Sequence, residues 1–262
     1  PIMGRSTKRG SPNRGAPSLG DLKRIKEESS LNICIQRNLG GIGDVLMTTP
    51  SLRAIKHEWP ESHLTYATDF KYMDGALREL LEHNSYIDQI LHYQALGNQK
   101  YDFIVDITSS GVPYEVPGAK PPNRIKIFAD AIGVSLEETG ALPVYEVTEE
   151  ESIWARQQIN KWKTYKYKKI VGIQVRSAAS SRSIDPNKLI EAANRLRDQN
   201  QCQVVFFESP RAGEDLSTVY NVDFPIFVDK SIAKVAALVE QMDLMITPDS
   251  ALMHFAGLFG VP

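Results

Sequence analysis

The chain has 262 residues, 42% of them hydrophobic, and a formal net charge of −2 at pH 7. This length accommodates one large domain or two of moderate size, and the apolar fraction is sufficient for a packed core. The near-neutral charge gives no overall bias toward nucleic acid, and the sequence contains no apolar run of the ~18–20 residues that a membrane-spanning helix needs. Cys34 and Cys202 lie in strand-like runs, which indicates buried thiols and neither a disulfide nor a metal cage.

The two ends of the sequence differ from the middle. Residues 1–30 carry seven Lys or Arg against three Asp or Glu, with few large apolar side chains and no secretory signal, so we expect a disordered basic tail. A solvated linker is the simpler interpretation, and attraction to an acidic membrane surface or RNA is the alternative. At the other end, Pro262 follows a helix where another strand is expected, which predicts an incomplete C-terminal domain.

Between the ends, strand and helix patterns alternate. The expected strands are Leu31–Gln36, His63–Ala67, Ile87–His92, Phe103–Ile107, Ile170–Val175, Gln203–Phe207, Pro225–Val228 and Leu244–Ile246. The expected helices are Asp44–His57, Met73–Glu82, Arg124–Ala131, Glu149–Lys163, Pro186–Gln199, Ile232–Gln241 and Ser250–Leu258. Short continuous apolar strands between helices are typical of parallel sheets covered on both faces. The pattern predicts an α/β protein of two doubly wound, Rossmann-like domains, residues 31–165 and 166–262.

The first motif is the run GGIGDVLMTTP at residues 40–50, which follows a strand and opens a helix. Gly41 and Gly43 permit a tight turn, but the run lacks the Gly-Lys-Ser/Thr of a Walker loop, and Asp44 would repel a pyrophosphate. Asp44 is therefore either a helix N-cap or a carboxylate that takes a proton from a hydroxyl at the mouth of a cleft.

The second motif is TPDSALMHFAG at residues 247–257, again between a strand and a helix. Backbone N–H groups at Ala251 and beyond, together with the Ser250 hydroxyl, suit a diphosphate at the carboxyl end of the strand. Asp249 is expected to face a sugar hydroxyl or to hold the turn. His254 lies one helical turn after Ser250 and is either a ligand-binding or a structural residue.

Together the two motifs resemble glycosyltransferase family 9, the ADP-heptose:lipopolysaccharide heptosyltransferases and their relatives. The segments YDFIVD at 101–106 and 123–133 are similar to the family more loosely, and the resemblance covers about residues 31–262. It implies a GT-B architecture in which the N-terminal domain holds the acceptor, with Gly41, Gly43 and Thr48 on its acceptor-side loop. It also implies inverting, metal-independent transfer without a cofactor, with Asp44 as the general base.

The resemblance further implies a basic residue that contacts the donor diphosphate. The loop RSAASSRSIDP at residues 176–186 follows the first strand of the second domain and offers Arg182 first and Arg176 second. The family often has Trp-Pro here, whereas this chain has Ile184-Asp185-Pro186, and either arginine could instead be a solvated loop charge. A third loop, Glu208–Glu214, is expected near the nucleoside.

The resulting prediction is a cytoplasmic glycosyltransferase whose partners are a nucleotide-sugar donor, with ADP-heptose the first candidate, and a glycan acceptor, with no role for nucleic acid. A lipid-linked acceptor would place the enzyme peripherally at the inner face of the membrane. The oligomeric state is left open. A nucleotide-sugar epimerase of the same architecture and a catalytically silent sugar-nucleotide-binding module are the alternatives.

Overall fold

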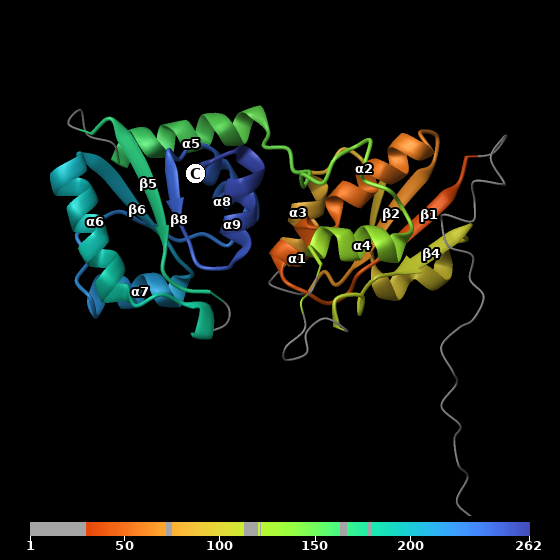
Figure 1. The fold of residues 1–262 in the computed structure, drawn as a ribbon, viewed down its shortest axis with the longest axis horizontal. Coiled ribbons are helices and arrows are strands. Elements are labelled where there is room, and N and C mark those ends of the chain that lie inside the picture. Colours follow the sequence, from red (N-terminus) through yellow and green to blue (C-terminus); the bar gives the residue numbers. More distant parts are fainter. Residues whose placement is uncertain (1–29, 72–74, 113–119, 121, 163–166, 178–179) are drawn as a thin grey trace, which may run out of the picture.

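The computed structural model describes residues 30–71, 75–112, 120, 122–162, 167–177 and 180–262. Residues 1–29 of the predicted basic tail, residues 1–30, therefore lie outside the described residues, as do parts of the expected helix Met73–Glu82 and of the loop that contains Ala178. The described chain folds into two parallel four-stranded sheets with helices packed around each, one sheet in each half of the molecule (Figure 1).

The first half is built from parallel strands in the order β3-β2-β1-β4. Its strands are β1 (Asn32–Gln36), β2 (His63–Thr68), β3 (Gln89–His92) and β4 (Phe103–Asp106). Its helices are α1 (Ile42–Leu46), α2 (Thr49–Glu58), α3 (Ala76–Glu82) and α4 (Arg124–Ile132), with the 3-10 turn η3 (Tyr93–Asn98). Ile33 pairs with Leu64 and with Phe103, so β1 is the central strand that precedes the first motif.

The second half repeats this arrangement, in the order β7-β6-β5-β8. Its strands are β5 (Lys169–Gln174), β6 (Cys202–Phe207), β7 (Ile226–Phe227) and β8 (Leu244–Ile246). Its helices are α5 (Glu149–Trp162), α6 (Pro186–Asn200), α7 (Pro210–Thr218), α8 (Ile232–Glu240) and α9 (Ala251–Phe259), with the 3-10 turn η5 (Ser180–Arg182). The α/β class and all eight expected strands are confirmed, with shifts of at most two residues at their ends.

One expected helix is wrong. The sequence pattern predicted a single helix over Asp44–His57, whereas the chain forms α1 and then restarts as α2. Pro50 has no N–H to donate to the carbonyl of Leu46, and the Thr49 hydroxyl donates to that oxygen instead (2.7 Å). The Thr48 hydroxyl donates to the carbonyl of Val45 in the same way (2.7 Å), and the break leaves α1 as a short helix within the first motif.

Another helix, α7, was not predicted at all. The segment that begins at Glu208 was expected to be a loop, but α7 starts two residues later, with Ser209 as its N-cap and Pro210 in its first turn. Gly213 lowers the helical propensity of this segment, yet the fold requires it. A Cβ atom at residue 213 would lie 2.6 Å from Cγ2 of Val228, so only glycine lets α7 approach the end of β7 this closely.

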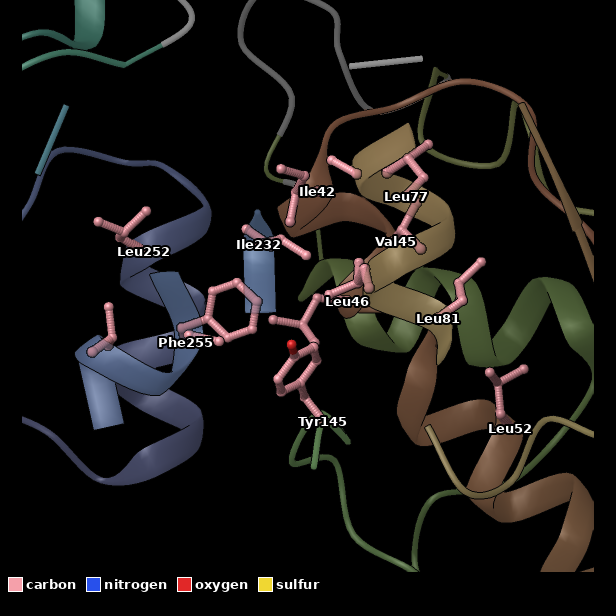
Figure 2. Close-up of a cluster of buried hydrophobic side chains, with 14 of the residues drawn as sticks. Ile42, Val45, Leu46, Leu52, Leu77, Leu81, Tyr145, Ile232, Leu252 and Phe255 are labelled. Carbon is pink, nitrogen blue, oxygen red and sulfur yellow. The ribbon is translucent and has the colours of Figure 1, made fainter. Parts of the chain in front are cut away.

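The two halves share one apolar core at the place where they meet. Figure 2 shows Val45 and Leu46 of α1 and Ile232 of α8 in one cluster with Phe255 of α9. Tyr145, from the segment before α5, packs edge-on against Phe255 with ring centroids 5.1 Å apart. Val45, Leu46 and Phe255 have no exposed surface. Their packing fixes the position of the first motif relative to the second.

Two further contacts hold the helices of the second half, and the second of them also joins the halves. Helix α5 packs against α8, and its Trp154 and Trp162 rings lie beside Phe227, each with a centroid separation of 6.1 Å. Glu79 of α3 accepts hydrogen bonds from the Ser231 hydroxyl (2.6 Å) and the Ile232 N–H (2.8 Å) at the start of α8. The division into residues 31–165 and 166–262 stays a prediction.

Candidate active site

A cavity of about 740 Å³ lies between the two halves and is lined by both motifs. From the first half, Gly41, Gly43, Asp44 and Arg124 line it. The second half contributes Gln174, Ser177, Arg182, Glu208, Asp249, Ser250, Ala251 and His254, among others. Most of these residues follow the carboxyl ends of strands, which is the edge where open α/β sheets bind ligands.

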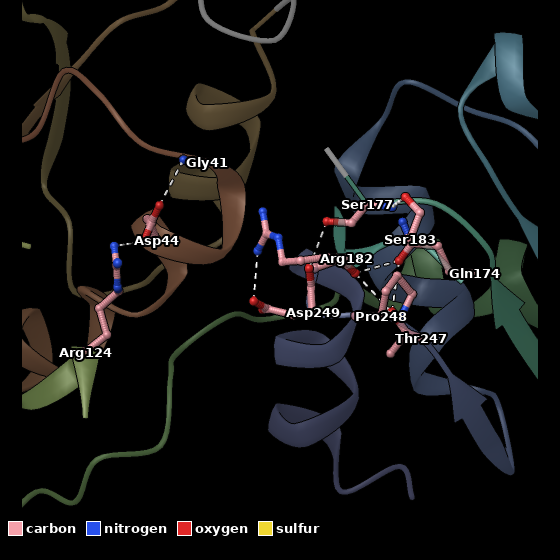
Figure 3. Close-up of polar contacts among 11 residues, drawn as sticks. Gly41, Asp44, Arg124, Gln174, Ser177, Arg182, Ser183, Thr247, Pro248 and Asp249 are labelled. Carbon is pink, nitrogen blue, oxygen red and sulfur yellow. Dashed lines mark hydrogen bonds and ion pairs between the residues drawn. The ribbon is translucent and has the colours of Figure 1, made fainter. Parts of the chain in front are cut away.

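Asp44 is the carboxylate at the first-half wall of this cavity. It is the third residue of α1, and the N-cap is Gly41, so the interpretation of Asp44 as the cap itself is wrong. Its Oδ2 accepts from the Gly41 N–H at 3.2 Å, and its Oδ1 forms an ion pair with Nη1 of Arg124 at 2.8 Å (Figure 3). The side chain keeps about a quarter of its surface exposed, which leaves it accessible from the cavity.

The other predicted residues of the first motif separate into two groups. Gly41 and Gly43 line the cavity, whereas Thr48 does not. Thr48 is fully buried, and its hydroxyl lies 3.0 Å from the hydroxyl of Tyr66 in addition to its bond to Val45. In this structure Thr48 therefore stabilises the break between α1 and α2 and is closed off from the cavity.

The second motif forms a polar turn before α9. The Ser250 hydroxyl donates to Oε1 of Gln174 at 2.6 Å, and the Thr247 hydroxyl donates to the same oxygen at 3.0 Å. Ser250 occupies the N-cap position of α9 without a side-chain capping bond. The first N–H groups of α9, beginning at Ala251, therefore have no side-chain cap, and the positive end of the helix points at the cavity.

The two predicted arginines have different surroundings. Arg182 lines the cavity and pairs with Asp249, its Nη1 lying 2.8 Å from Oδ2 of that residue (Figure 3). The Ser177 hydroxyl donates to the Asp249 carbonyl (2.9 Å) and so connects the loop after β5 to the loop after β8. Arg176 instead pairs with Asp215 of α7 at 2.8 Å and is not among the residues that line the cavity. Of the two predicted arginines, the geometry thus favours Arg182 as a cation of the cavity.

His254 lies where the two motifs meet. Its ring lines the cavity and contacts Gly43, which lies in the opposite half of the molecule. Burial lowers the pKa of His254 below its ordinary value, and the carboxylates of Asp249 and Asp44 partly oppose that effect. The half-buried imidazole is therefore biased toward its neutral form, which can both donate and accept a hydrogen bond.

Sequence reasoning missed several residues that shape the site. Gln174 ends β5 and holds two hydroxyls of the second motif, and Arg124 pairs with Asp44. The sequence analysis assigned Glu208 only to a loop expected near the nucleoside. Its Oε1 accepts from the N–H groups of Val175 (2.7 Å) and Arg176 (2.9 Å), and burial raises the pKa of this carboxyl group. The available signal for Glu208 was a polar residue directly after an apolar strand, and for Gln174 it was a polar residue within the apolar run Ile170–Val175.

Within the part of the chain that the structure describes, no group of three or more His, Cys, Asp or Glu side chains is arranged to hold a metal ion. Cys34 and Cys202 are both free and buried, as expected. None of the described helices combines the length and hydropathy that crossing a membrane requires.

Two Rossmann-like halves that face each other across one cavity define the GT-B class of fold. Residues 123–262 match the family model described as glycosyltransferase family 9 (heptosyltransferase). This match covers more than half of the chain, and the chain belongs to glycosyltransferase family 9.

Solved structures agree with this fold. A family 9 glycosyltransferase from Veillonella parvula superposes with a TM-score of 0.71 at 19% identity, over 88% of this chain and 79% of that one. The ADP-heptose lipopolysaccharide heptosyltransferase II of E. coli gives 0.67 at 15% identity, over 88% and 83%. The E. coli heptosyltransferase WaaC with ADP gives 0.61 at 12% identity, over 88% and 86%. A search of curated proteins finds no match.

Proposed function

We propose that this chain transfers a sugar, a heptose in the first instance, from a nucleoside diphosphate donor to a hydroxyl of a glycan. The observation that carries the proposal is the pairing of opposite chemistries across one cavity. Asp44 lies on the first-half wall, and Arg182 with the uncapped start of α9 lies on the other (Figure 3). A base for the acceptor and donors for the leaving group are the two requirements of such a transfer.

The proposed reaction proceeds in one displacement. Asp44 takes the proton of the acceptor hydroxyl while that oxygen forms a bond to the anomeric carbon of the sugar. The bond from the anomeric carbon to the diphosphate breaks, and its electron pair leaves with the diphosphate oxygen. Attack opposite the leaving group inverts the configuration at the anomeric carbon.

The second half supplies the groups that stabilise the leaving diphosphate. The N–H groups at Ala251 and beyond and the positive end of α9 face the cavity. Arg182 has five N–H donors, and its contact with Asp249 uses one of them. These donors could neutralise the developing charge with no metal ion in the step, and the neutral imidazole of His254 could hydrogen-bond the sugar or the diphosphate. Such pre-positioned donors are worth about 10²–10³-fold in rate each.

Donor identity is proposed from the family. The family model is described as heptosyltransferase, and WaaC, of the same fold, was solved with ADP, so ADP-heptose is the first donor to test. The acceptor is proposed to be a glycan hydroxyl, on a lipid-linked core or on another glycan.

Calorimetric titration with ADP, UDP, GDP and CDP tests the donor site. We expect selective binding of ADP, weakened at least about tenfold by Arg182→Ala, because one charge-assisted contact is worth about 1.5–3 kcal/mol. Arg176→Ala is the matched control, since Arg176 faces Asp215 outside the cavity lining, and should keep the wild-type affinity. Binding of none of the four nucleotides would exclude the proposed donor site and favour a silent module with another ligand.

A turnover assay tests whether Asp44 is the base. ADP release from ADP-heptose is measured with heptose-free lipopolysaccharide as the acceptor, for wild type and Asp44→Asn. We expect Asn to lower kcat at least about 10²-fold, within the range for removal of a general base, while ADP binding is unchanged. Conversion of the nucleotide-sugar without acceptor would instead indicate an epimerase. Full activity of Asp44→Asn would rule out Asp44 as the base.

A further inference from the structure

Both oxygens of the Asp44 carboxylate accept from a neighbouring donor, but unequally. The contact of Oδ1 with Nη1 of Arg124 is short, at 2.8 Å, and joins opposite charges. The contact of Oδ2 with the Gly41 N–H is longer, at 3.2 Å. The short charged contact is the stronger one, so Arg124 fixes the direction in which the carboxylate faces the cavity.

Arg124 is placed by helix α4, which it begins. The Asn123 side chain caps this helix by accepting from the Ile125 N–H at 2.9 Å, which fixes the first turn. Phe128 lies four residues after Arg124 and therefore on the same face of the helix, one turn further along. The Arg37 guanidinium lies over the Phe128 ring, 4.6 Å from its centroid.

Arg37 connects three parts of the first half beneath the first motif. It is only 3% exposed, and its Nη1 donates to the Ile107 carbonyl, just after β4, at 2.9 Å. The backbone of Gly40, with φ +110°, passes directly over it, and a Cβ atom there would lie 2.6 Å from Nη2. Arg37 thus touches the glycine run, the end of β4 and, through Phe128, the helix that carries Arg124.

Burying the charged guanidinium of Arg37 costs free energy of folding. The contacts of Arg37 in the described part of the chain are backbone carbonyls and an aromatic ring, and its Nε has no hydrogen-bond partner there. Burying a guanidinium without a carboxylate destabilises a fold relative to an apolar side chain of the same size. Because this burial is costly, Arg37 is better explained by what it orients than by a contribution to stability.

We propose that Arg124 is a positioning residue for Asp44, and that Arg37 acts through Phe128 to set the helix that presents Arg124. The inference rests on the proposed function of Asp44 as the base. Arg124 keeps Oδ1 occupied, so the proton of the acceptor hydroxyl moves to Oδ2, which the longer contact to Gly41 holds less firmly. Neither arginine gains or loses a proton.

The first test compares Arg124→Ala and Arg124→Lys with the matched control Arg78→Ala. Arg78 is an exposed helical arginine whose ion pair with Glu82 lies outside the cavity lining. We expect Arg124→Ala to lower kcat about 10²-fold, the loss that a misplacement of about 1 Å can cause. Lys should recover part of that loss, and added guanidinium should restore part of the activity of Arg124→Ala. The ADP affinity of every variant should stay within twofold of wild type.

A double-mutant cycle shows whether Arg124 acts through Asp44. If it does, Arg124→Ala has little further effect on the rate in the Asp44→Asn background. An unchanged kcat for Arg124→Ala, or a loss that is equal in both backgrounds and not rescued by guanidinium, would overturn the proposal.

Crystal structures provide a readout that does not depend on turnover. In Arg124→Ala the Asp44 carboxylate should rotate from its wild-type orientation, and in Arg124→Lys it should stay. A carboxylate that is unmoved in Arg124→Ala would overturn the positioning role. Full activity of Asp44→Asn, by contrast, would remove the proposed base, while a rotated carboxylate in Arg124→Ala would still support the positioning.

The role of Arg37 is tested with Arg37→Met, which keeps the volume and removes the charge, and with Phe128→Leu, which leaves Arg37 in place and removes the ring. We expect both to lower kcat about tenfold and to leave the ADP affinity unchanged. If Arg37→Met does not fold, Phe128→Leu decides the matter. Wild-type kcat in a folded Phe128→Leu variant would overturn the link from Arg37 to Arg124.

Discussion

The imidazole of His254 lies against the α-carbon of Gly43, and this contact joins the first motif of one half to the second motif of the other. A Cβ atom at residue 43 would lie 2.6 Å from Cδ2 and 3.0 Å from Nε2 of His254. Any side chain at this position would therefore displace the histidine from the cavity wall. Gly43 is therefore needed so that the two halves can approach each other here. The same close approach sets the orientation of His254 in the cavity wall.

Gly43→Ala should consequently destabilise the protein by about 1–2 kcal/mol, as overpacking of a close contact does. Urea unfolding measures this, and Gly41→Ala is the matched control. Gly41 has φ −74°, and a Cβ atom at residue 41 would meet no other atom within 4 Å, so alanine there should change stability by less than about 0.5 kcal/mol. Adding His254→Ala to Gly43→Ala should recover most of the loss. Equal stability of the two glycine variants would show that the contact is not tight.

The pH dependence of stability should report the burial of the same histidine. Burial lowers the pKa of His254 in the folded state, although Asp249 and Asp44 pull the other way. As the pH falls below the ordinary histidine value of about 6.5, the unfolded chain takes up the proton first. The contribution of His254 to stability is therefore complete above that pH and is lost as the pH falls through this window.

His254→Asn should remove this part of the pH dependence. Urea unfolding at pH 7.5 and pH 5.5 measures the slope for wild type and variant, and the wild type should lose more stability on acidification. A variant whose slope equals that of wild type would show that the folded state binds the proton as readily as the unfolded chain does.

Glu79 should stabilise the contact between the halves. Its carboxylate accepts from the Ser231 hydroxyl and the Ile232 N–H, at the positive end of α8. Glu79→Ala leaves these donors without their partner and should cost about 1–3 kcal/mol in thermal or urea unfolding. Glu82→Ala on the same helix is the control, because its exposed ion pair with Arg78 is worth about 0.3–0.5 kcal/mol. Equal losses for the two variants would contradict the bridging role.

The sequence was sufficient for the parts of the fold that local patterns determine. Eight apolar runs became strands, and the glycine run correctly placed Asp44 at the start of a helix. The helix break before Pro50 was also readable, since proline cannot donate to the carbonyl four residues earlier, but the apolar periodicity that continues past it concealed the break. Thr48 shows a different case, because the family resemblance placed it on the acceptor-side loop, whereas in this structure its hydroxyl lies 3.0 Å from the hydroxyl of the buried Tyr66.

The pairings inside the site were beyond the sequence because their members lie far apart along the chain. Arg124 follows Asp44 by 80 residues, and Ser250 follows Gln174 by 76. No periodicity or spacing rule links such positions. They meet only because α4 lies beside the first motif and because β5 and β8 are neighbours in the second sheet. The sequence therefore identified residues at strand ends that offer chemistry, and the tertiary structure decided which of them meet.

Gln174 is the clearest case for measurement. One of its atoms, Oε1, accepts from both Ser250 and Thr247, so it fixes the turn from which α9 starts. Gln174→Met keeps the volume and removes the acceptor, which frees both hydroxyls and loosens the turn. Two lost hydrogen bonds of about 0.5–1.5 kcal/mol each would weaken ADP binding about tenfold or more, if the diphosphate binds at this helix start.

Gln203→Met is the matched control for this variant. Gln203 lies on the neighbouring strand β6, is buried, and donates to the Val204 carbonyl at 3.0 Å without lining the cavity. It should lose stability while keeping the wild-type ADP affinity in calorimetry. If both variants bind ADP as the wild type does, the diphosphate does not depend on the second motif, and the donor site must be sought elsewhere along the cavity wall. If only Gln174→Met is impaired, the turn held by Gln174 is part of that site.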